Sequence, residues 1–493
     1  MNAPAEPVRS TTLERLARLL WAATLLSLPV TSFRYFPGGD ATYVRPLAFY
    51  PLALLLLVLL VQLVRGKWAF PWAGTWTPLI GVLLATLAAS LVGLLIAPPP
   101  LHGEDVVGRE LRAWATLLMG LGFFAGAAWM NRTEDDLRFS LKWLFAGFIL
   151  DVLWSGVQGA TFYLHLLPKP LVTHWQRAFS MRELIRTNRI SGLAYEPSWL
   201  AGQISTIYLP WLFAWLLTGQ RTTRFKWLEP VLLGCAGLLL LATFSRGGLL
   251  TVAATTILTF LLVGRRQIGA AWKWFVSGFR GGLPLVWRLG LIVAIAAVGV
   301  WALRFLTHKG YIARLWDTRA SSFQEFLVQN SAGSRAAYLV GALSAYEEYP
   351  WTGVGLGASG FYIYSHLPDW ALTTVPEIAR QLSPDSSLYP NPKNLYVRLL
   401  AETGLIGFFL FLAFQFSLLG DALTALKQPM LLWQYLGIAA VFTWLALIFY
   451  NITQDSLAIP NLWINLGMLV GLSALFAGDK PKRPDVESDE EAI

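Results

Sequence analysis

The sequence predicts an all-α, polytopic integral membrane protein with about twelve transmembrane helices. Of its 493 residues, 55% are hydrophobic and only 14% are charged, whereas soluble proteins carry about 25% charged residues. The mean hydropathy is +0.52, and many apolar runs approach the roughly 20 residues with which a helix spans a bilayer. The 23 tryptophans suit the membrane–water interface, where an apolar ring with one polar N–H is favoured.

Twelve apolar segments carry this prediction. The expected helices, in chain order, are 14–31, 46–64, 77–97, 110–130, 139–164, 198–218, 227–243, 247–264, 286–306, 394–418, 430–451 and 456–476. The turn FSRGG separates the seventh helix from the eighth, because its glycines allow the chain to reverse within an otherwise overlong apolar run. The N-terminus lacks a signal-peptide cleavage pattern, so we expect the first apolar run to stay as a helix.

The charged loops assign sides to these helices. Four short loops are rich in lysine and arginine, and all fall in the cytoplasm if both termini do, as the positive-inside rule requires: 65–76, 131–138, 219–226 and 265–285. This topology divides the chain into helices one to nine (1–306), a large, mainly helical external segment (307–393), helices ten to twelve (394–476) and a disordered cytoplasmic tail (477–493).

The external loop after the fifth helix breaks the positive-inside pattern. It contains Arg182, Arg186 and Arg189, which would share one face of a helix and repel one another there. Arg246, at the FSRGG turn, and Arg335, in the external segment, fall on the same side. The planar guanidinium matches phosphate oxygens, so we interpret these residues as a pyrophosphate site. The alternatives are a neutral exception to the charge rule and, for Arg246, an arginine that snorkels to the interface.

The motif YEPSWLAG opens the sixth helix. Pro197 suits the first helical position, which makes Glu196 a candidate N-cap. The alternative is that Glu196 is a carboxylate at the mouth of the cleft and accepts a proton from an acceptor hydroxyl. Tyr195 is a candidate for sugar binding. His366 is a second candidate base, although a lone histidine in a loop is more often a surface residue.

The tenth helix begins with NPKNLYVRLLAETG. Asn394 is expected to cap this helix or to face the cleft, and Glu402 lies about two turns deeper. A carboxylate in an apolar helix is a functional candidate, and Glu402 is accordingly a candidate sugar ligand; pairing with Arg398 is the structural alternative. The glycine-rich stretch 349–362 lacks the strand–helix context and the GKS/T ending of a nucleotide-binding loop. No metal-ligand constellation occurs on the outer side, so we expect no metal and no cofactor.

Four motifs in this order resemble the O-antigen ligase/polymerase superfamily of bacterial membrane glycosyltransferases: RISGLAYEPSWLA, TFSRGGLL, SRAAYLVGALSAYEEYPWTGVGLG and NLYVRLLAETGLIG. The resemblance implies a GT-C type fold in the bacterial inner membrane. It also implies an undecaprenyl-diphosphate-linked oligosaccharide as donor, a glycan acceptor and transfer at the outer face. By motif, Arg189, Arg246 and Arg335 would hold the diphosphate, with Arg182 and Arg186 as supporting charge.

One departure from the family pattern concerns the base. Ligases commonly have a histidine before the asparagine of the NLY motif, and this chain has Lys393. Lysine is a poor base unless its pKa is strongly lowered, so Glu196, His366 and Lys393 are all candidates. The departure favours a polymerase of O-antigen or exopolysaccharide repeat units that inverts the anomeric centre, with a chain-length regulator as a candidate partner.

Two other functions are alternatives to a polymerase. A ligase that transfers glycan to lipid A-core or to protein would share nearly every motif. A polysaccharide-lipid transporter or flippase would also have about twelve helices, but would more often show internal repeats and broken helices in matching halves. The sequence shows neither of these features.

Overall fold

A computed structural model of the protein is built from helices, as the sequence predicts. It describes residues 12–36, 42–66, 70–182, 188–278, 282–308, 321–329, 332–381 and 389–478. Arg186, parts of the predicted external segment and most of the predicted tail lie outside the described residues.

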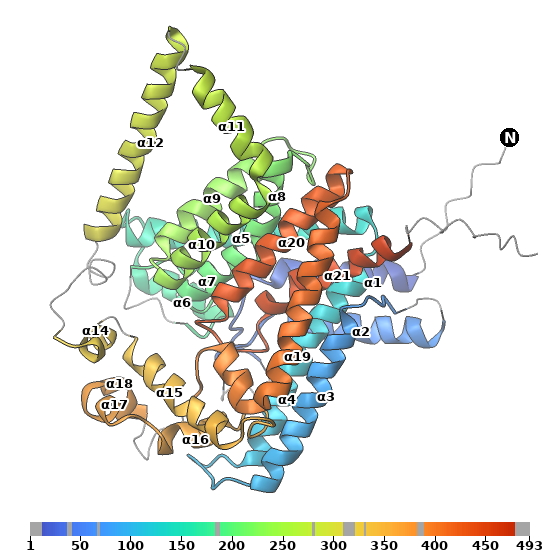
Figure 1. Ribbon diagram of the computed structural model, residues 1–493, viewed down its shortest axis with the longest axis vertical. Coiled ribbons are helices and arrows are strands. Elements are labelled where there is room, and N and C mark those ends of the chain that lie inside the picture. Colours follow the sequence, from blue (N-terminus) through green and yellow to red (C-terminus); the bar gives the residue numbers. More distant parts are fainter. Residues whose placement is uncertain are drawn as a thin grey trace, which may run out of the picture.

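All twelve expected segments form helices (Figure 1). They are α1 (Thr12–Ser27), α2 (Phe49–Val64), α3 (Trp76–Ile96), α4 (Val106–Met130), α5 (Glu134–Phe162), α7 (Pro197–Gln203) continued by the π-helical turn η2 (Ile204–Tyr208) and α8 (Leu209–Thr218), α9 (Leu228–Ala242), α10 (Arg246–Val263), α12 (Leu283–His308), α19 (Leu395–Leu426), α20 (Leu431–Tyr450) and α21 (Pro460–Gly478). Eight are long and apolar enough to cross a membrane: α3, α4, α5, α7 to α8, α10, α12, α19 and α20. The all-α, polytopic fold is therefore confirmed.

Seven further helices lie between these segments. They are α6 (Lys169–Phe179), α11 (Arg265–Ser277), α14 (Phe323–Gln329), α15 (Gly333–Glu348), α16 (Ser359–Ser365), α17 (Asp369–Thr374) and α18 (Pro376–Gln381). The last five belong to the predicted external segment, where the sequence predicts mainly helical structure. Both α15 and α16 pack against α19, and α15 to α18 lie together beside the bundle (Figure 1).

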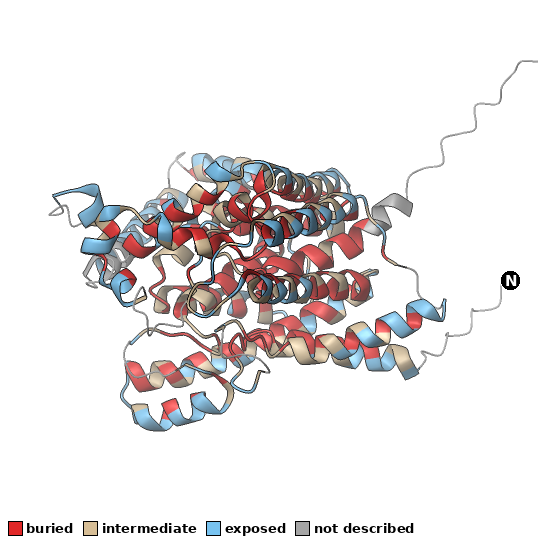
Figure 2. Ribbon diagram, turned by 90° about the horizontal axis from the view of Figure 1, so that it is seen from below, coloured by how far each residue is buried: buried red, intermediate tan, exposed pale blue. Residues whose placement is uncertain are grey.

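The interior of the bundle is buried, whereas α12 is not. Figure 2 shows buried residues concentrated in the middle of the molecule. In the most apolar stretch of α7 to α8, 83% of the residues are buried inside the protein, whereas in that of α12 only 6% are. Together α11 and α12 project away from the other helices (Figure 1). An apolar helix with so little protein contact is expected to face lipid.

The two described arginines of the loop after α5 do not share a helical face. The helix in this loop, α6, ends at Phe179, before Arg182. The next residues are extended instead, because Met181 N donates to Ser32 O at 3.1 Å. Arg189 is also outside any helix. The conditional prediction of a common helical face is therefore wrong for Arg182 and Arg189.

One transmembrane helix, α19, is broken, which the sequence analysis does not predict. At Gly404, φ is 61° and ψ is −168°, which interrupts α19. Segment 350–355 enters the break and replaces the missing helical hydrogen bonds: Leu405 N donates to Pro350 O at 2.8 Å, and Val354 N donates to Ala401 O at 3.0 Å. A single glycine in an apolar run does not reveal such a break, because the partner segment lies about fifty residues earlier in the chain.

The helix ends that the predicted topology assigns to the outer face meet at one end of the bundle. Ile190 N, just before α7, donates to Ala242 O at the end of α9 over 3.1 Å. Leu395 N, at the start of α19, donates to Asn451 O after α20 over 2.9 Å. The loops at this end hold the residues that the sequence singles out.

Candidate active site

The extended segment that leads into α7 is anchored to α5. Gln158 Oε1 accepts hydrogen bonds from Ser191 N at 3.0 Å and from Gly192 N at 2.9 Å, and its Nε2 donates to Gly192 O at 2.9 Å. Asp151 Oδ1 accepts from Leu193 N at 2.7 Å. Both α5 side chains are fully buried. Because buried polar groups are costly without partners, these bonds specify the path of the segment.

This path places Arg189 beside the end of α9. Its Nε donates to Thr243 O at 2.8 Å. Arg182, on the same loop, donates from Nη1 to Tyr195 O at 2.6 Å. Partial burial lowers the pKa of Arg182; the negative charge of Glu196 opposes this shift, and the positive charge of Arg189 adds to it. Arg182, Arg189 and Glu196 are thus close enough to interact electrostatically.

The turn with Arg246 packs against the same helix start. Arg246 is the first residue of α10, and the preceding Ser245 caps this helix by accepting from Gly248 N at 3.2 Å. A Cβ atom at Gly248 would overlap Ala201 of α7. The close approach of the two helix starts brings Arg246 to the side of the bundle that holds Glu196. We call Arg182, Arg189, Glu196 and Arg246 the arginine cluster.

Glu196 occupies the N-cap position of α7, as one sequence interpretation holds. Its backbone carbonyl accepts from Trp199 N at 2.9 Å and from Leu200 N at 3.1 Å. Its side chain makes no capping hydrogen bond, and one carboxylate oxygen accepts from Ser198 Oγ at 3.0 Å instead. Glu196 therefore occupies the cap position, but its carboxylate does not take part in capping.

A second group of charged residues surrounds the start of α19. Arg398 Nε donates to Glu402 Oε2 at 2.9 Å, and its Nη1 donates to the backbone oxygen of Asp455 at 2.7 Å. The other oxygen of Glu402 accepts from Ser359 Oγ at 2.8 Å. Glu402 is only 2% exposed. The pairing with Arg398, which the sequence leaves as an alternative to sugar binding, is therefore present.

Lys393 and Asn394 are held by the same surroundings. Asn394 Oδ1 caps α19 by accepting from Tyr396 N at 3.0 Å and Val397 N at 3.1 Å. The backbone N of Lys393 donates to Asp455 Oδ2 at 2.9 Å. We call Lys393, Arg398, Glu402 and Asp455 the α19 ionic group. Of the two roles expected for Asn394, the structure shows the cap.

The loop between α20 and α21 joins the α19 ionic group to the arginine cluster. At its start, Tyr450 interacts electrostatically with Glu196, and a Cβ atom at Gly202 of α7 would overlap the Tyr450 ring. Five residues later, Asp455 binds Lys393 as described above. The two clusters are therefore neighbours along one short segment.

Arg335 is next in the chain to a residue that is linked to the α19 ionic group, and no contact among the described residues joins it to the arginine cluster. It is exposed on α15 and makes no ion pair within the part of the chain that the structure describes. The adjacent Ser334 donates to Glu377 Oε2 at 2.8 Å. The other oxygen of Glu377 lies 3.6 Å from Lys393 Nζ. In the described structure, Arg335 is thus linked to Lys393 through its neighbours.

His366 is not brought to the arginine cluster by any described contact. Its side chain is exposed, with Nε2 3.3 Å from Glu348 Oε1 and Nδ1 3.0 Å from Tyr362 O. Both partners belong to the predicted external segment. This geometry matches the surface role that a lone loop histidine more often has.

The sequence analysis did not identify several buried polar residues of this region. Gln158 and Asp151 of α5 were not singled out, although polar residues seven positions apart in an apolar helix are a usable signal. Glu110, on α4, is 4% exposed. Its Oε1 has no hydrogen-bond partner among the described residues, and Cβ atoms at Gly93 and Gly355 would collide with it. Glu110 and Glu402 interact electrostatically.

The anchoring of the segment before α7 yields a first prediction. Replacing Gln158 by leucine leaves the amides of Ser191 and Gly192 without their acceptor, at roughly 1–3 kcal/mol for each buried group. If Arg189 binds the donor diphosphate, as the sequence resemblance implies, we expect the half-saturating donor concentration to rise about tenfold, because Arg189 loses its fixed position and each 1.4 kcal/mol changes an equilibrium by about that factor.

The matched variant is Gln158→Glu, which keeps an acceptor for both amides and should retain more activity than the leucine variant. Donor titrations of both purified variants provide the measurement. Equal donor dependence in Gln158→Leu and the wild type would show that the anchoring does not position Arg189.

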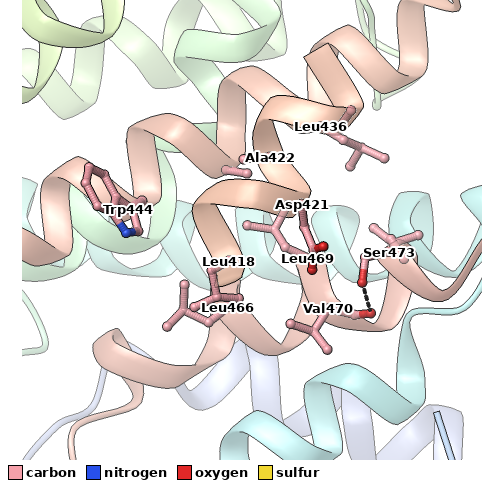
Figure 3. A pocket seen from close by; sticks show the side chains of 12 residues that line it. Leu418, Asp421, Ala422, Leu436, Trp444, Leu466, Leu469, Val470 and Ser473 are labelled. Atoms are coloured by element: carbon pink, nitrogen blue, oxygen red, sulfur yellow. Dashed lines mark hydrogen bonds between the residues drawn. The ribbon is translucent and has the colours of Figure 1, made fainter. Parts of the chain in front are cut away.

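A pocket lies elsewhere, between α19, α20 and α21 (Figure 3). Its lining is mostly apolar, with Asp421 and Ser473 as polar members. Asp421 lies about 25 Å along α19 from the break at Gly404, at a rise of about 1.5 Å per residue. The pocket is therefore separate from both clusters. No group of three or more potential metal ligands occurs among the residues that the structure describes.

Part of the chain matches the model of a known protein family. No curated protein matches the chain. Residues 231–412 match the family model described as O-antigen ligase. The matched region runs from α9 into α19, so it contains Arg246 and Glu402, whereas Arg189 and Glu196 precede it. This match to the O-antigen ligase family over residues 231–412 confirms the resemblance of this membrane protein to the O-antigen ligase/polymerase superfamily.

Proposed function

We propose that the protein polymerises O-antigen or exopolysaccharide repeat units at the outer face of the bacterial inner membrane, with both termini in the cytoplasm. The donor is a glycan on undecaprenyl diphosphate, and the acceptor is a sugar hydroxyl. The observation that carries this proposal is the arginine cluster, which gathers cations from two distant loops at the end of the bundle that the topology assigns to the outside.

The charge balance of the arginine cluster supports an anionic ligand. Two guanidinium groups, those of Arg182 and Arg189, interact with one carboxylate, Glu196, and Arg246 begins the helix whose start packs against α7. The repulsion between the guanidinium groups is relieved when a ligand with two or more negative charges binds between them. A diphosphate has this charge, and its oxygens match the paired donors of arginine.

Glu196 is the best-placed base of the three candidates. Its carboxylate accepts a hydrogen bond from the neighbouring Ser198, whereas Lys393 is held in an ion pair and His366 contacts the predicted external segment. The acceptor oxygen forms a bond to the anomeric carbon as its proton passes to Glu196. The bond from that carbon to the phosphate oxygen breaks, and its electrons leave with the diphosphate.

Direct displacement of this kind inverts the anomeric centre. The leaving diphosphate is stabilised by the arginines, so most of the rate enhancement comes from positioning and charge neutralisation. No metal ion is required for these steps. Arg335, next in the chain to Ser334, is proposed to contact the outer part of the donor diphosphate. Tyr195, Asn394 and Glu402 stay proposed neighbours of the sugars.

A ligase is the second candidate, favoured by the O-antigen ligase description of the matching family. The lysine at position 393, where ligases commonly have histidine, favours the polymerase. A lipid transporter is the third, and it would need no chemical step.

The test uses the purified protein in nanodiscs with lipid-linked repeat units as the sole substrate. A polymerase produces a ladder of longer lipid-linked chains. Addition of lipid A-core separates the alternatives, because a ligase transfers glycan to the core without lengthening it. If the wild-type protein forms neither product, the glycosyltransferase proposal is wrong.

A further inference from the structure

An exposed aromatic ring stands next to the arginine cluster. Tyr43, in the connection from α1 to α2, is 52% exposed. Its ring stacks on Tyr195, with centroids 4.9 Å apart and an angle of 19° between planes. Trp199 of α7 continues the group, with its ring centroid 5.4 Å from that of Tyr195. The three rings thus form one group, in which the ring of Tyr43 is exposed.

Hydrogen bonds fix the chain segments that carry the two stacked rings. Arg45 N donates to Thr31 O at 2.9 Å, and Phe33 N donates to Arg45 O at 2.7 Å. Thr31 also binds the segment that carries the other ring, because its Oγ1 accepts a hydrogen bond from Tyr195 N at 2.9 Å. The segments that carry the two tyrosines are therefore attached to the same residue. A binding surface built in this way loses little conformational entropy when a ligand binds.

The stacked pair borders the charges that we assign to the diphosphate. The carbonyl oxygen of Tyr195 accepts from Arg182, and Glu196 is the next residue. A ligand whose diphosphate lies on the arginines would place its first sugar within reach of this surface. Pyranose rings present flat patches of C–H groups that pack on aromatic faces, and binding sites combine such apolar walls with a few polar groups.

Interfacial anchoring is the rival explanation of an exposed tyrosine. The same connection contains a residue for which that explanation suffices. Tyr35 is 67% exposed and contacts Phe33 edge-on, at 5.7 Å between centroids. No ring contact joins it to Tyr195, so it is the natural control for Tyr43.

We propose that Tyr43 and Tyr195 form the subsite for the diphosphate-proximal sugar of the donor. This inference rests on the proposed function, because it takes the arginine cluster as the diphosphate site. Tyr43 supplies the exposed face, and Tyr195 supports it from below. The surface contributes to binding of the glycan and not to binding of the lipid or of the diphosphate.

Direct binding to the full-length protein in nanodiscs tests this subsite without relying on turnover. The two ligands are undecaprenyl diphosphate bearing one repeat unit and bare undecaprenyl diphosphate. For Tyr43→Ala, we expect the Kd of the glycan-bearing lipid to rise about tenfold and that of the bare lipid to change less than about twofold. Tyr43→Phe keeps the ring and should bind both ligands like the wild type, as should Tyr35→Ala.

The subsite is refuted if Tyr43→Ala binds the glycan-bearing lipid as the wild type does, or if it weakens both ligands equally. It is also refuted if Tyr35→Ala has the same selective effect. Failure of the proposed function has a different signature. In that case, the wild-type protein does not lengthen chains, and Arg246→Ala leaves the affinity for bare undecaprenyl diphosphate unchanged.

Discussion

Replacement of Arg246 by alanine is expected to reduce polymer formation at least about 100-fold, the scale on which loss of one donor to a developing oxyanion acts. Arg246 is the first residue of α10, in a turn fixed by the Ser245 cap, so the variant removes charge without removing a core side chain. The measurement is the rate of chain elongation by the purified protein at saturating donor.

Two further variants separate charge from geometry. Arg246→Lys keeps the positive charge but lacks the fork of donors, and we expect it to recover only part of the lost rate. Arg138→Ala is the control, because Arg138 forms an exposed ion pair with Glu134 at 2.7 Å and such pairs contribute about 0–1 kcal/mol. Full-length polymer at a normal rate from Arg246→Ala would exclude the arginine from the diphosphate site.

Replacement of Gly404 by alanine is expected to destabilise the protein by about 3 kcal/mol or more. The backbone there has φ of 61° and ψ of −168°, a region that only glycine adopts readily and that costs other residues about 1–3 kcal/mol. A Cβ atom would also overlap the backbone of Trp351. The segment 350–355 can then no longer stay in the break of α19.

Thermal unfolding in detergent, together with the amount of folded protein, checks this prediction. Gly420→Ala is the matched control, because Gly420 lies in the same helix and nothing surrounds the position of its Cβ. Alanine is favoured over glycine in a helix interior by about 1 kcal/mol, so this control should be neutral or stabilising. If Gly404→Ala melts like Gly420→Ala, the break in α19 is not a feature of the folded protein.

Local features of the chain were predictable because they depend on neighbouring residues. The length and polarity of apolar runs indicate membrane helices, so all twelve expected segments are helical although several ends differ by a few residues. The Pro197 signal correctly marks the start of α7. The turn at Arg246 is also where the sequence expects it.

Features that depend on distant residues were not predictable in this way. The sequence offers two roles for Glu402, and only the contacts with Arg398 and Ser359 show it paired and buried. The broken helix was missed, because Gly404 has the same local sequence context whether or not another segment enters. The anchoring role of Gln158 depends on distant residues too, since Ser191 and Gly192, whose amides it binds, lie more than thirty residues away.

The sequence by itself determined the membrane class, the order of the helices and the motifs of the O-antigen ligase/polymerase superfamily. These follow from hydrophobic run length and from residues close together in the chain. The tertiary structure alone decided which charges converge. Arg189 reaches Thr243 across 54 positions, and Tyr195 reaches Thr31 across 164. Contacts of that range arise when helices pack, because packing sets which loop ends meet.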